Sequence, residues 1–257
     1  VFAISIILVL SLLPLMRAPE RAPREELEES LGEILRLAVR DPSYMMIFAG
    51  FFSCGYQLAF ITAHFPALVT EMSAPIDPLG WCGDLGIETT AALGGFAISV
   101  IGAANIIGTL MAGWAGKRFG KKWLLSGIYA GRSIAAAWFI LTPITANTVL
   151  IFSFAMGFLW LATVPLTSGL VAHIYGIRYM ATLYGIVFFS HQVGSFVGVY
   201  LGGVLYDMYG SYTTVWWIGI AVGVFSSLIH LPIREEARLS PKSPCLLYTS
   251  DAADDVE

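Results

Sequence analysis

The sequence TAALGGFAISVIGAANIIGTLMAGWAGKRFGKK, which occupies residues 90–122, shows the pattern that decides the fold. It contains no Asp, Glu, Lys or Arg before Lys117, and four basic residues then follow within a short turn rich in glycine. A helix needs about 20 mostly apolar residues to cross the hydrocarbon core of a bilayer. The stretch therefore predicts a membrane-spanning helix over residues 90–114 that ends in a basic connection.

The same pattern recurs along the whole chain. Arg132 alone carries charge between Lys122 and Arg178, and three further runs carry none: 44–70, 179–206 and 208–233. We expect six complete spans, at about 44–68, 90–114, 123–143, 148–172, 181–205 and 212–232. Residues 1–16 are also apolar, and we interpret them as the end of one further spanning helix.

The composition excludes several classes of protein. Hydrophobic residues make up 57% of the 257 residues and charged residues 12%, whereas a soluble domain has about 25% charged residues. A net charge of −4 without a basic stripe argues against nucleic-acid binding. Cys54, Cys82 and Cys245 show neither a disulfide framework nor the spacing of metal ligands. Because the sequence also contains no phosphate-binding loop and no nucleophile triad, we expect neither an enzyme nor a bound cofactor.

The positions of the Lys and Arg residues predict the orientation. These residues gather in alternate connections, namely 17–43, 116–122, 173–180 and the tail, whereas 71–88, 144–147 and 206–211 contain none. Short connections rich in Lys and Arg stay in the cytoplasm. We therefore expect a multi-pass protein of the inner (plasma) membrane whose C-terminus is cytoplasmic.

The polar segment 17–43 is expected to be a cytoplasmic loop that carries an amphipathic helix. Apolar residues recur there at helical spacing from Leu27 to Ala38, so the helix would lie on the membrane surface or against the bundle. Asp41 and Pro42 then predict the N-cap and first residue of the next helix.

Three further segments complete the expected organisation. A six-helix bundle is expected over residues 44–232, and a cytoplasmic tail over 233–244. Residues 245–257 begin with CLLYTSDAAD, which resembles the translation of a sequencing adapter. We interpret this last segment as a non-native tail and assign it no function.

The basic turn resembles the conserved G-x-x-x-D-R-x-G-R-K loop of the major facilitator superfamily. The matching residues are Gly113, Arg118, Gly120, Lys121 and Lys122, while Lys117 stands where the family usually has Asp. The resemblance implies a gating loop. In the family, the Asp takes part in the charge contacts that hold the outward-open state, so its replacement by Lys117 weakens the inference about gating. The alternative is that the basic residues simply anchor two helix ends at an anionic leaflet.

Two longer stretches, residues 50–68 and 168–212, resemble the seventh helix and the tenth-to-twelfth helix region of bacterial transporters in the monocarboxylate-transporter-like branch of that superfamily. The resemblance covers residues 1–238 approximately. It implies an all-α membrane protein, namely the six-helix C-terminal half of a twelve-helix carrier plus the end of the sixth helix. The chain would then be a fragment, and its partner would be the missing N-terminal six-helix half.

The resemblance also implies a function. A secondary active transporter of this family moves small solutes by alternating access, and this branch implies a small organic anion that travels with a proton or by exchange. The alternative is a carrier-like membrane sensor or scaffold that transports nothing. A membrane-bound enzyme is disfavoured because the polar groups of the predicted spans are scattered in depth.

Polar residues inside the predicted spans are candidates for substrate binding because burying them in a membrane is costly. They are Gln57, His64, Asn105, Arg132, His191 and Gln192. Arg132 is a candidate counter-charge for an anion, and His191 is a candidate proton carrier or carboxylate ligand. Hydrogen bonds between helices are the alternative for Gln57, His64 and Asn105. His191 could instead be a neutral imidazole bonded to a nearby hydroxyl, and Arg132 could extend toward the cytoplasmic interface or form a structural bond to a neighbour.

Two other groups of residues complete the expectations. Gly194, Gly198 and Gly202 repeat the small-xxx-small spacing that lets two membrane helices approach closely, so we expect them to pack against another helix. His173 and His230 are expected near the membrane interfaces, in contact with solvent.

Overall fold

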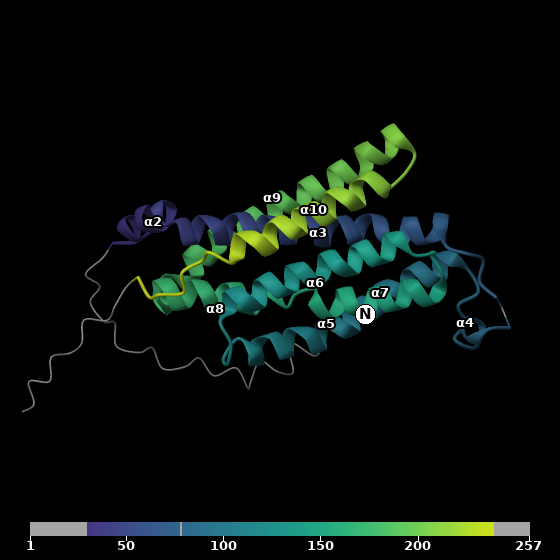
Figure 1. Cartoon of the computed structure of the whole chain (residues 1–257), viewed down its shortest axis with the longest axis horizontal. Coiled ribbons are helices and arrows are strands. Elements are labelled where there is room, and N and C mark those ends of the chain that lie inside the picture. The colour runs from purple at the N-terminus through teal and green to yellow at the C-terminus, as the bar shows by residue number, and fades with distance from the viewer. Residues whose placement is uncertain (1–29, 78, 239–257) are drawn as a thin grey trace, which may run out of the picture.

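The computed structural model describes residues 30–77 and 79–238, and its long helices run roughly along one axis (Figure 1). Six helical segments in this part are long and apolar enough to cross a bilayer, as the charge-free runs predict. They are α3 (Pro42–Met72), α5 (Thr90–Ala115), α6 (Lys121–Leu141), α7 (Ala146–Leu159) with α8 (Thr163–Tyr175), α9 (Ile177–Tyr209) and α10 (Thr213–His230). The predictions for residues 1–29 and 239–257 lie outside the described residues.

The two short helices lie at opposite ends of the bundle. The helix α2 (Leu31–Arg40) begins in a capping box of Ser30 and Glu33 and leads directly into α3, whose N-cap is Asp41 with Pro42 at its first position. The helix α4 (Trp81–Asp84) lies at the other end (Figure 1). The connection between α5 and α6 and the segment after α10 lie at the α2 end, so basic connections gather at one end of the molecule.

The core of the described part consists of two hydrophobic clusters that follow one another along the helix axes. The cluster at the α2 end includes Tyr44, Phe51 and Leu125. The other cluster includes Phe65 and Trp216, whose rings are in contact. Large apolar side chains also remain exposed on the outer faces of α5, α6, α9 and α10. Helices that are apolar all round suit a molecule surrounded by lipid.

The fourth span is broken where the sequence predicts one continuous helix. The helix α7 ends at Leu159 and α8 begins at Thr163. Pro165 explains the break, because proline has no backbone N–H and its ring clashes with the carbonyl four residues earlier. That carbonyl belongs to Leu161, and it accepts the N–H of Val164 at 3.0 Å instead.

The fifth span begins earlier than the predicted boundary at residue 181. The helix α9 starts at Ile177, directly after Gly176, so α8 and α9 are joined by a single residue. Gly176 has φ +82°, a backbone conformation that residues other than glycine rarely adopt. A glycine at this position therefore permits a chain reversal that replaces most of the expected loop 173–180.

Candidate functional site

A layer of polar side chains lies where the two hydrophobic clusters meet, around the break in the fourth span. We call it the mid-depth polar layer, and it consists of Cys54, Asn105, Arg132, Thr163 and His191. The five residues come from five different helices: α3, α5, α6, α8 and α9. The discontinuous helix and these polar groups therefore occupy the same depth of the bundle.

Arg132 holds the end of α7. Its side chain is fully buried, with an exposed fraction of 0%. The guanidinium donates from Nε at 3.0 Å and from Nη2 at 2.7 Å to the carbonyl of Leu159, and Nη2 also donates to the carbonyl of Trp160. These carbonyls have no partner within α7 because the helix stops there. Arg132 thus stabilises the C-terminal end of α7 at the break in the fourth span.

Asn105 holds the other side of the same break. Its Oδ1 accepts the backbone N–H of Leu161 at 2.9 Å and the hydroxyl of Thr109 at 3.2 Å. Asn105 and Arg132 together satisfy an N–H and two carbonyls that the interrupted helix leaves without helical partners. Unpaired backbone groups inside a membrane are costly, so such compensation is what permits an irregular backbone at this depth.

The remaining members of the layer surround the Arg132 side chain. Nη1 of Arg132 lies 3.4 Å from the sulfur of Cys54, and that sulfur lies 3.3 Å from the hydroxyl of Thr163. His191 packs beside Cys54, with its ring stacked at 5.2 Å on Phe188. Among the described residues, the Nδ1 of His191 is buried without a hydrogen-bond partner. Cys54 was not among the predicted site residues, and only the tertiary structure, in which Arg132 of α6 and Thr163 of α8 reach its sulfur, brings it into this layer.

The other predicted site residues lie elsewhere in the bundle. Gln57 is buried between α3 and α10, where Nε2 donates to the carbonyl of Gly219 at 3.0 Å, while its Oε1 has no partner in the described part. His64 lies toward the α4 end, with Nε2 at 3.0 Å from the carbonyl of Val199. Gln192 is exposed on α9. Of the six candidates, Arg132, Asn105 and His191 therefore meet around the break.

Three glycines of α9, namely Gly194, Gly198 and Gly202, lie against α3. A Cβ atom built on Gly194 would collide with the carbonyl of Phe52, and one on Gly198 would collide with the carbonyl of Tyr56. On Gly202 it would collide with the ring of His64. The backbones of α3 and α9 therefore approach more closely at these positions than any larger residue would allow.

The basic turn contacts the segment that follows α10. The backbone N–H of Lys122 donates to Glu235 at 2.5 Å, and its ammonium donates to the carbonyl of Ile233 at 3.0 Å. Arg118 lies over the ring of Trp114, with its guanidinium carbon 4.3 Å from the ring centre. Gly113 falls in the last turns of α5, Lys117 and Gly120 in the turn, and Lys121 at the first position of α6. Glu235 thus contacts the turn through a backbone N–H.

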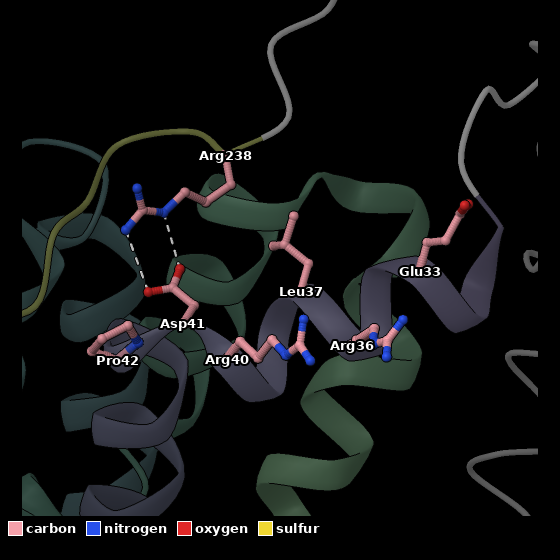
Figure 2. Close-up of a pocket in the computed structure, with 7 residues that line it drawn as sticks. All are labelled: Glu33, Arg36, Leu37, Arg40, Asp41, Pro42 and Arg238. Atoms are coloured by element: carbon pink, nitrogen blue, oxygen red, sulfur yellow. Dashed lines mark hydrogen bonds and ion pairs between the residues drawn. The ribbon is translucent and has the colours of Figure 1, made fainter.

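A second polar cluster at the same end is centred on Asp41. Its carboxylate pairs with Arg238 at 3.0 Å (Figure 2). It also accepts the hydroxyl of Tyr175 at 2.7 Å and the N–H of Ser43 at 2.9 Å. Burial by itself raises the pKa of Asp41, but the three donors outweigh it and the pKa lies below the usual value. The sequence indicates Asp41 as an N-cap, and only the tertiary structure reveals its other partners.

The prediction for His230 is wrong. The side chain has an exposed fraction of 1%, its Nδ1 lies 2.7 Å from the carbonyl of Ser226, and its ring stacks on Tyr129 at 5.1 Å. The reason is that α10 packs along α6, which covers the last turn of α10 and leaves no contact with solvent. His173 is exposed, in agreement with the prediction.

Comparison with known proteins identifies the family. A model of the Major Facilitator Superfamily matches residues 78–244, more than half of the chain. The uncharacterized MFS-type transporter YcxA of Bacillus subtilis (strain 168) is 25% identical over 240 residues, which are 89% of this chain and 54% of that protein. A triacylglyceride transporter of Mycobacteroides abscessus is 23% identical over 144 residues, 55% of this chain and 26% of that protein.

The chain spans about half the length of the first of these relatives. Both relatives are named as transporters, which supports the prediction that the chain is not an enzyme. The chain has six apolar spans, and the family model matches most of them, so the chain belongs to the major facilitator superfamily.

Proposed function

We propose that the chain is the C-terminal half of a secondary active transporter that moves a small organic anion, such as a monocarboxylate, with a proton or by exchange. The six spans and the coverage of about half of a transporter relative support the division into halves. In carriers of this type, two repeats rock around a site near the middle of the membrane. We refer below to this chain joined to its proposed N-terminal half as the complete carrier.

The charge of the mid-depth polar layer carries the proposal of an anionic substrate. Arg132 cannot lose its proton in a protein, and the groups that bond it in the described part are carbonyls and a thiol rather than a carboxylate. Arg132 therefore supplies a positive charge at mid-depth. The helix α8 also begins there without a side-chain cap, and the N-terminal end of a helix attracts anions.

Arg132 supports anion binding through its field rather than through direct contact. Its donors already bond the end of α7, so we assign direct contact with substrate to groups that have spare hydrogen-bonding capacity. His191 has an unpartnered Nδ1, Gln57 has an unpartnered Oε1, and Gln192 is exposed on α9. An imidazole can exchange a proton near neutral pH, which makes His191 the proposed proton carrier.

Uptake by the complete carrier in proteoliposomes tests this function. We expect saturable uptake of a labelled short-chain monocarboxylate that increases with an inward proton gradient or with an internal exchange anion. A labelled triacylglyceride is the comparison substrate, because one relative is named as a transporter of that neutral lipid. Uptake of the neutral lipid without any uptake of monocarboxylate would refute the proposed substrate class.

Substitutions in the same assay test the site. His191→Ala is expected to lower uptake and to flatten its pH dependence, and Gln57→Ala is expected to raise the KM. His173→Ala is the matched control, since this histidine is exposed at the end of α8. If His191→Ala and Gln57→Ala both behave like the wild type, the site assignment is wrong even if transport itself is observed.

Labelling of engineered cysteines tests the proposed orientation, in which the basic connections face the cytoplasm. Cysteines at Ser73 and Ser211, at the α4 end, should react with an impermeant reagent on intact cells, whereas one at Phe119 should not. The opposite pattern would reverse the orientation of the bundle.

A further inference from the structure

A groove at the α2 end has no role in the proposed transport site. It lies between α2, the start of α3 and the segment after α10, and its volume is about 550 Å³ (Figure 2). This volume falls in the range of small-molecule sites, about 300–1,000 Å³. Three arginines line the groove, Arg36 and Arg40 from α2 and Arg238 from the segment after α10.

One of these arginines is already neutralised. Arg238 pairs with Asp41 through Nε at 3.0 Å and Nη2 at 3.3 Å, and Asp41 is saturated by two further donors. This pair forms one wall of the groove and leaves no spare carboxylate oxygen for the arginines of α2. Its contribution to the charge of the groove is therefore close to zero.

The two arginines of α2 carry the remaining positive charge. Arg36 and Arg40 are four residues apart, on successive turns of one helix face, and both are exposed. Like charges at this spacing repel each other. Within residues 30–77 and 79–238, no carboxylate lies within ion-pair distance of either one. Glu33 also lines the groove, but its carboxylate bonds Ser30 in the capping box, and Figure 2 shows it pointing away from both guanidinium groups.

The apolar residues of α2 indicate where the groove lies relative to the bilayer. Ile34 and Ala38 are buried against the bundle, whereas Leu37, which lines the groove, is 38% exposed, and Val39 is 58% exposed. Only Asp41 separates α2 from α3. A short amphipathic helix in this position lies at the level of the lipid headgroups, where its exposed apolar side chains meet acyl chains.

We propose that this groove binds the phosphate of an anionic phospholipid through Arg36 and Arg40, with an acyl chain along Leu37. Guanidinium groups bind phosphate oxygens in a forked, two-bond geometry. A free phosphate offers the same oxygens but cannot cover the exposed apolar side chains, so the structure favours the lipid. The occupied groove also relieves the repulsion between the two arginines and fixes α2 against α3.

Lipid titration of the complete carrier, followed by native mass spectrometry in detergent, tests the proposal. The probes are phosphatidylglycerol, zwitterionic phosphatidylcholine and inorganic phosphate. We expect phosphatidylglycerol to bind with the highest affinity. Each of Arg36→Gln and Arg40→Gln should weaken that binding roughly five-fold, as about 1 kcal/mol per basic residue at an anionic surface implies.

Arg234→Gln is the matched control, because Arg234 is an exposed arginine at the same end of the bundle but does not line the groove. It should bind phosphatidylglycerol like the wild type. Arg36→Lys and Arg40→Lys keep the charge and lose the fork, so they should fall between the wild type and the Gln variants.

Three outcomes would overturn the proposal. The first is equal phosphatidylglycerol affinity in the wild type and both Gln variants. The second is an equal loss in Arg234→Gln, which would indicate a diffuse charge effect. The third is displacement of phosphatidylglycerol by inorganic phosphate at equal concentration, which would indicate a site for the free anion. None of these outcomes depends on transport activity, so they are independent of the proposed function.

Discussion

Replacement of Arg132 by Met tests whether this residue primarily holds the break in the fourth span. Methionine has similar length and no charge, so the change removes the hydrogen-bond donors and leaves most of the packing volume. The carbonyls of Leu159 and Trp160 would lose their Arg132 donors in a buried position. We expect the helix ends around the break to separate or to move toward other donors.

The magnitude follows from three opposing contributions. A buried carbonyl left without a donor costs about 1–3 kcal/mol, so two cost roughly 2–6 kcal/mol. Side-chain hydrogen bonds measured within membrane proteins are weaker, about 0.6 kcal/mol on average, and removing a buried charge recovers some desolvation energy. The balance is a loss of about 2–3 kcal/mol. For a domain of this size, each kcal/mol lowers the unfolding midpoint by roughly 2–4 °C.

The assay is thermal unfolding of the complete carrier in detergent, followed by tryptophan fluorescence at one fixed scan rate, because membrane proteins of this size unfold irreversibly. Arg132→Met should lower the midpoint by about 5–10 °C. Arg132→Lys retains the charge but not the fork, so it should lose stability while it keeps most of the affinity for an anionic substrate. Asn105→Ala should also destabilise, and its combination with Arg132→Met should be less than additive because both act on one break.

An unchanged midpoint in Arg132→Met would refute this reasoning. Loss of transport in Arg132→Lys without loss of stability would instead indicate that the guanidinium contacts the substrate directly. Unfolding midpoint and transport, measured on this pair of variants, therefore distinguish a residue that stabilises the break from one that binds the substrate.

The remaining predictions concern helix packing and the charged end of the bundle. Gly198→Leu should lower the same unfolding midpoint, because the new side chain forces α3 away from α9 at the carbonyl of Tyr56. The expected cost is about 1–3 kcal/mol or more. Gly203→Leu is the control and should leave the midpoint unchanged, because a Cβ atom at Gly203 meets nothing within 4 Å. Asp41→Asn should destabilise at neutral pH by removing the partner of Arg238. The lowered pKa of Asp41 means that its contribution is present above about pH 4, the ordinary carboxyl value, and is lost as pH falls through the folded-state value. The wild type and Asp41→Asn should therefore converge in stability in acid, and a constant difference between them would contradict this account.

The connections between the spans show which helix boundaries can be predicted from the local sequence. The span before the basic turn ends at Ala115, within a residue of the predicted boundary, because the charges that follow cannot enter the hydrocarbon core. The predicted start of the fifth span, residue 181, differs from the observed start of α9 at Ile177, although Gly176 is a local signal for a single-residue reversal. Pro165 was likewise available as a signal for the break in the fourth span, but a proline does not reveal which side chains will bond the freed carbonyls.

The sequence by itself determined that six apolar, charge-poor segments are long enough to cross a membrane and that basic connections gather at one end. These properties follow from hydropathy and chain length, which each segment carries independently of its neighbours. Only the tertiary structure decided what the polar residues inside those segments do. Arg132 faces the end of α7, Asn105 faces Leu161, and His230 is covered by α6. The cost of an unpaired polar group in lipid requires that each find a partner, and which partner is within reach depends on how the helices pack.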